Sequence, residues 1–181
     1  MGGVTDVRDE LSRHSDQRGA ALVEMALVLP LLLMLLLGIV SAGIAYNHQL
    51  SLTHAARESG RHGATLPVTN FGSMSAWLDV VAQRAMDDAT GSLDPGVPGF
   101  FLCVAYVHPN GTTALDSTQS RTGGTTGSYA GSSCFTDGRP ADERRVQVVV
   151  ARDVDFNALV FETTLTLDSE AVSRFEAGFG F

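Results

Sequence analysis

The stretch that decides the fold is residues 18–46, which read RGAALVEMALVLPLLLMLLLGIVSAGIAY. The twenty-one residues from Met25 to Ala45 carry no charge. As a helix, such a segment is about 31 Å long, close to the thickness of the hydrocarbon layer of a bilayer. Glu24 stands at the entrance of the run, and a charged side chain at membrane depth costs about 2.5–3.5 kcal/mol on insertion scales. The sequence therefore predicts a transmembrane helix over residues 20–46, with Glu24 as a candidate functional residue.

The segment before the apolar run, residues 1–19, is polar, mixed in charge and without apolar periodicity. We expect it to be a disordered cytoplasmic leader. Three arginines precede the run and two follow it within about twenty residues, and cytoplasmic flanks of membrane helices are the richer in Lys and Arg. This bias predicts a single-pass protein with a cytoplasmic N-terminus and an extracytoplasmic C-terminal domain.

The helix is predicted to bend within the membrane and to continue beyond it. Pro30 lacks the N–H group that would bond to the Ala26 carbonyl, so we expect a local kink there. Residues 47–64 contain no proline, and we expect them to extend the same helix. One side of this extension has small or apolar residues at helical spacing, namely Leu52, Ala55, Ala56, Ser59 and Gly63. So narrow a face suits close packing against a sheet.

Three histidines lie on this extension, but their spacing does not suit a metal site. His48, His54 and His62 are six and eight residues apart, whereas a helical metal site needs a pair four residues apart. We interpret them as surface side chains.

The rest of the chain, residues 65–181, is predicted to be an outer domain that includes a second helix. That helix is expected over residues 75–89, with Ser73 or Ser75 as its N-cap and Gly91 as its stop. Its apolar face consists of Trp77, Leu78, Val81, Ala82, Ala85 and Ala89.

Runs of β-branched and aromatic residues predict three strands, at residues 100–107, 146–150 and 164–168. Residues 110–140 are rich in Gly, Ser and Thr, and we expect a long surface loop there, with at most a short strand near Ser133–Phe135. The predicted fold is therefore α+β. A long N-terminal transmembrane helix continues into a small outer domain of one or two helices packed on a short, mostly antiparallel sheet.

Two cysteines, Cys103 and Cys134, lie downstream of the membrane segment. If that side faces an oxidising compartment, they form the one possible intrachain disulfide. The alternative is a pair of buried, unpaired thiols.

Charge and motifs exclude several classes of function. The formal net charge is -8, all twelve basic residues are arginine, and no basic cluster is present, which argues against a nucleic-acid partner. The sequence has no nucleophile elbow, zinc-spaced Cys/His set, Walker loop or dinucleotide fingerprint. We therefore expect no enzymatic activity, no metal and no cofactor.

Three short segments carry a family resemblance: Leu22–Pro30, which reads LVEMALVLP, then Ala55–Glu58, which reads AARE, and Gly60-Arg61. With these, residues 21–64 resemble the TadE-like family of tight-adherence pilus proteins. The resemblance implies a minor pilin-like subunit of a bacterial Flp-type pilus. Such a subunit sits in the cytoplasmic membrane, acts with other pilin-like subunits and pilus assembly proteins, and can be incorporated into a cell-surface pilus.

The same resemblance implies cleavage by a prepilin peptidase. Gly19 would be the last leader residue, Ala20 the new N-terminus and Glu24 the fifth mature residue. Met25 stands where the family often has an aromatic residue. A pilin-like subunit that is not cleaved and stays anchored in the membrane is therefore an alternative interpretation.

Two other classes fit parts of the pattern. One is a secreted protein with a Sec signal peptide, for which Ser41-Ala42-Gly43 offers small residues at the cleavage positions, although the apolar run is longer than an ordinary signal core. The other is a single-span anchor whose outer domain binds a ligand. The mature N-terminal residue separates the three: Ala20 for the pilin-like protein, Ile44 or Tyr46 for secretion, and Met1 or Gly2 for a simple anchor.

Overall fold

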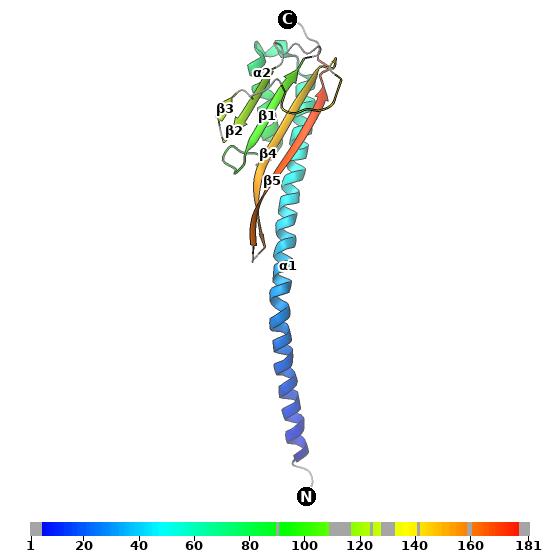
Figure 1. Cartoon of the computed structure of the whole chain (residues 1–181), viewed down its shortest axis with the longest axis vertical. Helices are drawn as coiled ribbons and strands as arrows, with labels where there is room; N and C mark the ends of the chain where they lie inside the picture. The colour runs from blue at the N-terminus through cyan, green and yellow to red at the C-terminus, as the bar shows by residue number, and fades with distance from the viewer. Residues whose placement is uncertain are drawn as a thin grey trace. The chain divides into compact units, whose positions relative to one another are not determined.

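The structure is a computed structural model that describes residues 5–89, 91–108, 117–123, 125–127, 133–140, 142–158 and 161–177. The chain divides into two compact units. One contains Met1–Ala42 and Phe156–Glu162, and the other, which we call the outer unit, contains Gly43–Asp155 and Thr163–Phe181. The elements in chain order are α1 (Thr5–Thr65), the 3₁₀ helix η1 (Val68–Phe71), α2 (Met74–Asp88), β1 (Phe101–Val107), β2 (Ser117–Thr122), β3 (Thr125–Gly127), β4 (Arg145–Ala158) and β5 (Phe161–Arg174) (Figure 1).

Helix α1 begins earlier than the sequence analysis predicts. It starts at Thr5, so residues 5–18 are helical and the expectation of a disordered leader is wrong there. The segment from Thr5 to Gln17 contains neither glycine nor proline, so no residue in it opposes extension of the apolar helix toward the N-terminus. The position where α1 begins therefore does not indicate where a leader ends.

Within the outer unit, the face of α1 predicted to pack against a sheet is buried. Leu52, Ala55, Ala56 and Ser59 each have 0% of their surface exposed. Ser59 donates its hydroxyl to the Ala55 carbonyl of the preceding turn at 2.6 Å, so its polar group needs no partner outside the helix. Small side chains on this face let the helix lie close to its neighbours.

Helix α2 packs beside α1 on the same face of the sheet. Its N-cap is Ser73, one of the two predicted candidates, whose hydroxyl oxygen accepts a hydrogen bond from the Ala76 N–H group. All six residues of its predicted apolar face are buried. Gly63 of α1 and Val81 of α2 meet so closely that a Cβ atom on Gly63 would lie 2.9 Å from a Val81 methyl group.

The five strands form one sheet in the order β3-β2-β1-β4-β5. Strand β1 lies in the middle and pairs antiparallel with both β2 and β4, with Cys103 opposite Val149 in the β1–β4 ladder. Between β4 and β5, Thr164 donates to Asp155 and Thr166 donates to Asp153, which is an antiparallel arrangement. The α+β prediction, with helices against a mostly antiparallel sheet, is confirmed.

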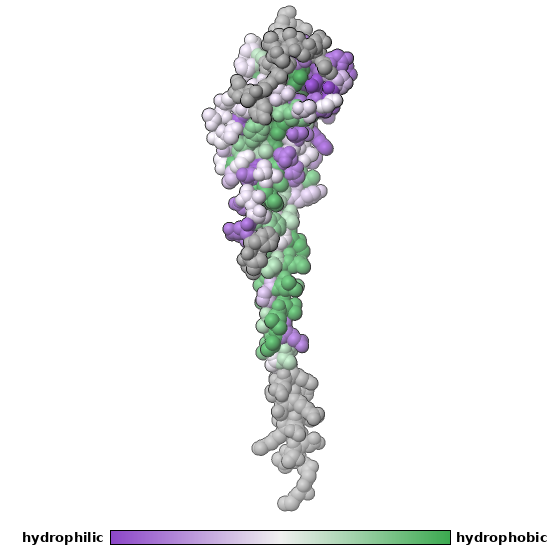
Figure 2. Space-filling view, viewed as in Figure 1, coloured by the Kyte–Doolittle hydropathy of each residue, from purple (hydrophilic) through white to green (hydrophobic). Residues whose placement is uncertain are grey.

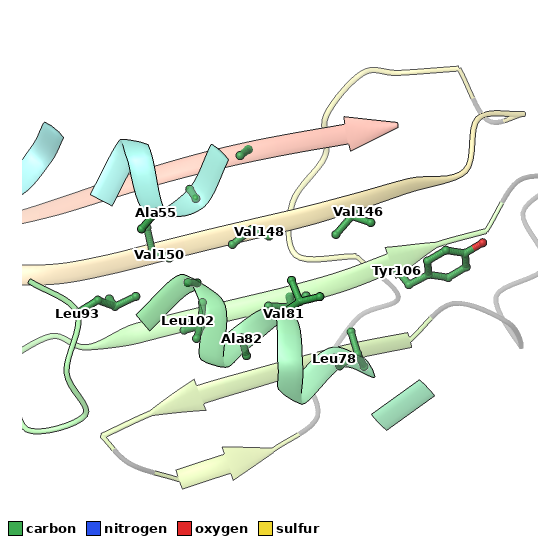
Figure 3. Close-up of a cluster of buried hydrophobic side chains, with 14 of the residues drawn as sticks. Ala55, Leu78, Val81, Ala82, Leu93, Leu102, Tyr106, Val146, Val148 and Val150 are labelled. Carbon is green, nitrogen blue, oxygen red and sulfur yellow. The ribbon is translucent and has the colours of Figure 1, made fainter. Parts of the chain in front are cut away.

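The core lies between the two helices and one face of the sheet. Figure 3 shows residues of α1, α2, β1 and β4 converging there, and the buried cluster includes Ala55, Leu78, Val81, Ala82, Leu93, Leu102, Tyr106, Val146, Val148 and Val150. Every second residue takes part from Leu102 to Tyr106 in β1 and from Val146 to Val150 in β4, as strand alternation requires. At the far end of the cluster, Trp77, Tyr106 and Phe175 pack edge to face with ring centroids 5.2–6.2 Å apart.

The prediction of a long surface loop over residues 110–140 is wrong in part, because β2 and β3 lie inside it. Strand β2 reads STQSRT and lacks the apolar alternation that reveals a strand. Its stabilising contacts are tertiary: Gln119 and Arg121 both reach the Asp79 carboxylate of α2, at 2.9 and 2.8 Å. Ser133–Phe135, where a short strand was expected, consists of bends.

The segment around Cys134 covers the side of the sheet that faces away from the helices. Cys134 is joined to Cys103 of β1 by a disulfide, with Cα atoms 5.9 Å apart. Gln147 of β4, fully buried, accepts from the Cys134 N–H and donates to the Phe135 carbonyl and the Asp137 carboxylate. A covalent bond and a satisfied polar side chain thus fix this segment on the sheet.

Candidate functional site

The apolar segment of α1 in the first unit is the leading candidate for a functional site. From Leu22 to Val40 its large apolar side chains are exposed, by 37–74% with Met34 excepted, and none of its most apolar window is buried. Figure 2 shows the hydrophobic colour gathered along this part of the helix. A surface of this kind is not stable in water and needs lipid or other helices around it.

Among the described residues, the part of α1 from Gly19 to Thr65 is the one helix long and apolar enough to cross a membrane. The criterion is length and composition. It agrees with the predicted single membrane span and does not by itself give the orientation.

Gly19, Ala20 and Glu24 all lie within this helix and are exposed. Ala20 and Glu24 are four residues apart, so they lie on one side of the helix about one turn from each other. The Gly19–Ala20 peptide bond lies within the helix. Glycine lowers the free-energy cost of local unwinding there because it is a poor helix former.

Small residues follow in the same segment and leave room for another helix. A Cβ atom placed on Gly38 or Gly43 would meet nothing within 4 Å. Open, small positions on an apolar helix allow a second helix to approach closely. Pro30 lies inside α1, and the kink expected at that position stays a prediction.

The structure brings together three polar residues of the outer unit that the sequence analysis did not connect. The Nδ1 atom of His48 lies 3.0 Å from the Ser92 hydroxyl and 3.3 Å from the Arg152 guanidinium, which also donates to the Ser92 carbonyl at 2.9 Å. His54 is exposed, as the sequence predicts, whereas His48 and His62 are half-buried.

The alternation of inward and outward side chains along β4 could have pointed to this cluster. Val146, Val148, Val150 and Val154 point to the helices, and Arg152 occupies the same row. An arginine on an inward row needs partners, because an uncompensated charge there is costly. The partners are on α1 and on the segment after α2, which the pattern of β4 cannot reveal.

Burial lowers the pKa of His48, and the positive charge of Arg152 lowers it further. Burial also lowers the pKa of Arg152, although an arginine remains protonated in proteins. Both effects favour the neutral form of His48, which can accept a hydrogen bond from the guanidinium of Arg152. Among the described residues, no group of three or more His, Cys, Asp or Glu side chains is placed to bind a metal.

One comparison with known proteins has a match. The family model described as TadE-like protein matches residues 19–61, which include Gly19, Glu24 and Pro30 and extend into the outer unit. No curated protein and no solved structure matches the chain. The matched segment coincides with the apolar part of α1 and its buried continuation, and over residues 19–61 the chain is similar to the TadE-like family.

Proposed function

We propose that the protein is a minor pilin-like subunit of a bacterial Flp- or Tad-type adhesion pilus, cleaved after Gly19 and assembled through its N-terminal helix. The observation that carries this proposal is the coincidence of two features on one segment. The TadE-like match covers residues 19–61, and within it the helix exposes apolar side chains in the first unit and buries a small-residue face in the outer unit. The role is structural rather than catalytic.

On this proposal, the outer unit is extracytoplasmic and the leader is cytoplasmic. The Gly19–Ala20 bond then lies at the cytoplasmic face of the membrane, where a membrane-embedded prepilin peptidase reaches it. An oxidising compartment around the outer unit accounts for the Cys103–Cys134 disulfide in the structure.

The test of processing is Gly19→Leu, with Gly38→Leu as its matched control. Both glycines lie in α1, and a Cβ atom at either position meets nothing within 4 Å, so both substitutions are sterically tolerated within the chain. Gly19→Leu is expected to leave a full-length precursor about two kilodaltons heavier than the mature form, whereas Gly38→Leu matures normally. N-terminal sequencing of the wild-type protein should give Ala20. Normal maturation of Gly19→Leu contradicts the assigned cleavage position.

Glu24 has a role in assembly on this proposal. Cleavage leaves a positively charged amine on Ala20, and a carboxylate drawn into an apolar helix bundle needs such a partner, because a buried charge left alone costs several kcal/mol. The amine of a neighbouring subunit satisfies Glu24 at one axial stagger and so sets the register between subunits. Other pilin-like subunits, rather than a soluble ligand, are the partners of this segment.

The test is Glu24→Gln, assayed separately for cleavage and for incorporation into pili or the assembly complex. Cleavage is expected to be near normal and incorporation to fail. Glu58→Gln, at another exposed carboxylate of α1, is the control and should assemble normally. Normal incorporation of cleaved Glu24→Gln would exclude charge pairing, and loss of cleavage alone would instead assign Glu24 to peptidase recognition.

A further inference from the structure

The inference concerns the cluster of His48, Ser92 and Arg152, which we call the His48 clamp. Its members come from three places: His48 from α1, Ser92 from the segment between α2 and β1, and Arg152 from β4. All three belong to the outer unit. Their hydrogen bonds therefore tie the helix to two other parts of the same unit, and the inference does not depend on the proposed function.

The donors around His48 favour one tautomer of its neutral ring. Arg152 has only N–H donors, so the Nδ1 atom that it approaches at 3.3 Å must be an acceptor. The imidazole proton is then on Nε2, and the Ser92 hydroxyl, 3.0 Å from the same Nδ1 atom, can also donate to it. Protonation of Nδ1 would remove the acceptor that faces Arg152 and place a second positive charge against the guanidinium, while the Ser92 hydroxyl can turn to accept from Nδ1–H.

Charged groups on the neighbouring elements do not offset this repulsion. Asp88 of α2, which lines the same cleft, is in an ion pair with Arg84 at 2.9 Å. Asp94 accepts from the Gly96 N–H. Asp153 of β4 accepts from Thr166 on the opposite side of the strand, and Asp168 of β5 shares that side by alternation. His54, the other titratable group of the cleft, is on α1 itself.

A solvent path for the proton exists. An open cleft of about 480 Å³ lies beside the clamp and is lined by Asn47, His48, Leu50, Ser51, His54, Asp88, Gly91 and Ser92. The imidazole can thus exchange protons with the solution without unfolding of the outer unit.

We propose that the His48 clamp is a pH-sensitive device in which the contact between His48 and Arg152 joins α1 to β4 while His48 is neutral, and that this contact opens in mild acid when Nδ1 is protonated. The lowered pKa of His48 supports this direction. The contribution of the clamp to stability is complete above the ordinary histidine pKa of 6.5 and is lost as the pH falls below it. Opening breaks the contact between Arg152 and Nδ1 and displaces the guanidinium, which also holds the Ser92 carbonyl.

The first test is the titration of His48 in the full-length, disulfide-bonded chain in detergent, followed by NMR of the imidazole carbons. The midpoint is expected below 6.5. Arg152→Met should raise it, because the substitution removes the repelling cation, whereas His54→Gln should leave it unchanged. A wild-type midpoint at or above 6.5, or one that Arg152→Met does not raise, would overturn the proposal.

The second test is hydrogen exchange of the Ser92 amide, which donates to the Ala89 carbonyl at 2.8 Å. His48→Gln keeps an acceptor but does not titrate. Comparing the exchange rates of wild type and His48→Gln at the same pH cancels the intrinsic effect of pH on exchange. Relative to His48→Gln, wild-type exchange at Ser92 should rise roughly threefold or more between about pH 7.5 and pH 5. The Phe175 amide, bonded to the Arg144 carbonyl at 2.9 Å, should show no such rise. If the ratio of the wild-type to the His48→Gln exchange rate at Ser92 is the same at both pH values, the opening step is contradicted.

Discussion

At the residue scale, Gly99 is a position where any side chain would meet both backbone strain and the carboxyl group of Asp153. Its φ is +65°, in the left-handed region, and a Cβ atom there would lie 2.3 Å from the carboxyl carbon of Asp153. Backbone strain and steric overlap therefore act together at this turn, which precedes β1. Gly72 has a similar φ of +69° but open space around it. A substitution at Gly72 therefore measures the backbone strain without the steric overlap.

We predict that Gly99→Ala destabilises the outer unit more than Gly72→Ala. Gly72→Ala should cost about 1–2 kcal/mol, from left-handed strain alone. Gly99→Ala should cost about 1–3 kcal/mol more, from crowding against Asp153. Urea unfolding followed by tryptophan fluorescence measures both, since Trp77 is buried in the core. Equal losses for the two variants would contradict the steric argument.

Asp137 is a second residue whose neighbours decide its behaviour. Its side chain is 4% exposed and lies 2.6 Å from Arg145. Burial alone would raise the pKa of Asp137, but hydrogen bonds from the Arg139 N–H and from Gln147, together with the charge of Arg145, lower it below its ordinary value. The carboxylate is thus stabilised in the folded state.

A loss of stability in acid follows from this lowered pKa. The stabilising effect is complete above the ordinary aspartate pKa of 3.8 and is lost as the pH falls below it, since the unfolded chain then binds the proton more readily. Asp137→Asn should be less stable than wild type near neutral pH and approach it in acid. Asp142→Asn, at an exposed residue nearby, is the control. A constant difference between Asp137→Asn and wild type from neutral pH to acid would refute this.

At the element scale, the cover of the sheet depends on a covalent bond. The Cys103–Cys134 disulfide joins β1 to a segment that has no strand of its own, across a separation of 31 residues. Chain-entropy arithmetic for a loop of this size gives roughly 3–4 kcal/mol. Much of the sequence between the two cysteines is Gly, Ser and Thr, which supplies little apolar burial in compensation.

We predict that Cys103→Ala with Cys134→Ala lowers the free energy of unfolding by roughly 3–4 kcal/mol. The double variant avoids a free thiol, and reduction of the wild-type protein should have a comparable effect. Chemical unfolding of the three forms is the measurement. A double variant as stable as the oxidised wild type would show that hydrogen bonds to Gln147 suffice to hold the segment around Cys134 on the sheet.

At the scale of the whole molecule, the buried core and the exposed apolar surface belong to different units. All residues of the core cluster, from Leu52 to Phe175, lie in the outer unit. Most of the large exposed apolar side chains lie between Leu22 and Val40, in the first unit. The outer unit therefore has what it needs to fold without the segment that requires lipid.

We predict that a chain comprising residues 43–181 folds without detergent, with the disulfide formed and cooperative unfolding. The full chain should require detergent, because its apolar helix segment is exposed to solvent. Size-exclusion chromatography and circular dichroism without detergent compare the two. Aggregation of the 43–181 chain would show that residues before Gly43 are needed for the fold of the outer unit.

The sequence by itself determined the features that depend on local pattern. The uncharged run after Glu24 predicts the membrane-spanning helix, and helical spacing predicts the buried faces of α1 and α2 before any contact is known. Valine alternation predicts the inward row of β4. These features can be predicted because the periodicity of a helix or strand depends only on residues close together in the sequence.

The tertiary structure alone decided what depends on partners far apart in the chain. Strand β2 has no apolar alternation and is stabilised by pairing with β1 and by contacts of Gln119 and Arg121 with Asp79, 40 and 42 residues away. The same is true of the His48 clamp, in which His48 and Arg152 are 104 residues apart. Polar side chains show no periodicity that names their partners, and their pairing is determined only when packing of the apolar core brings the elements together.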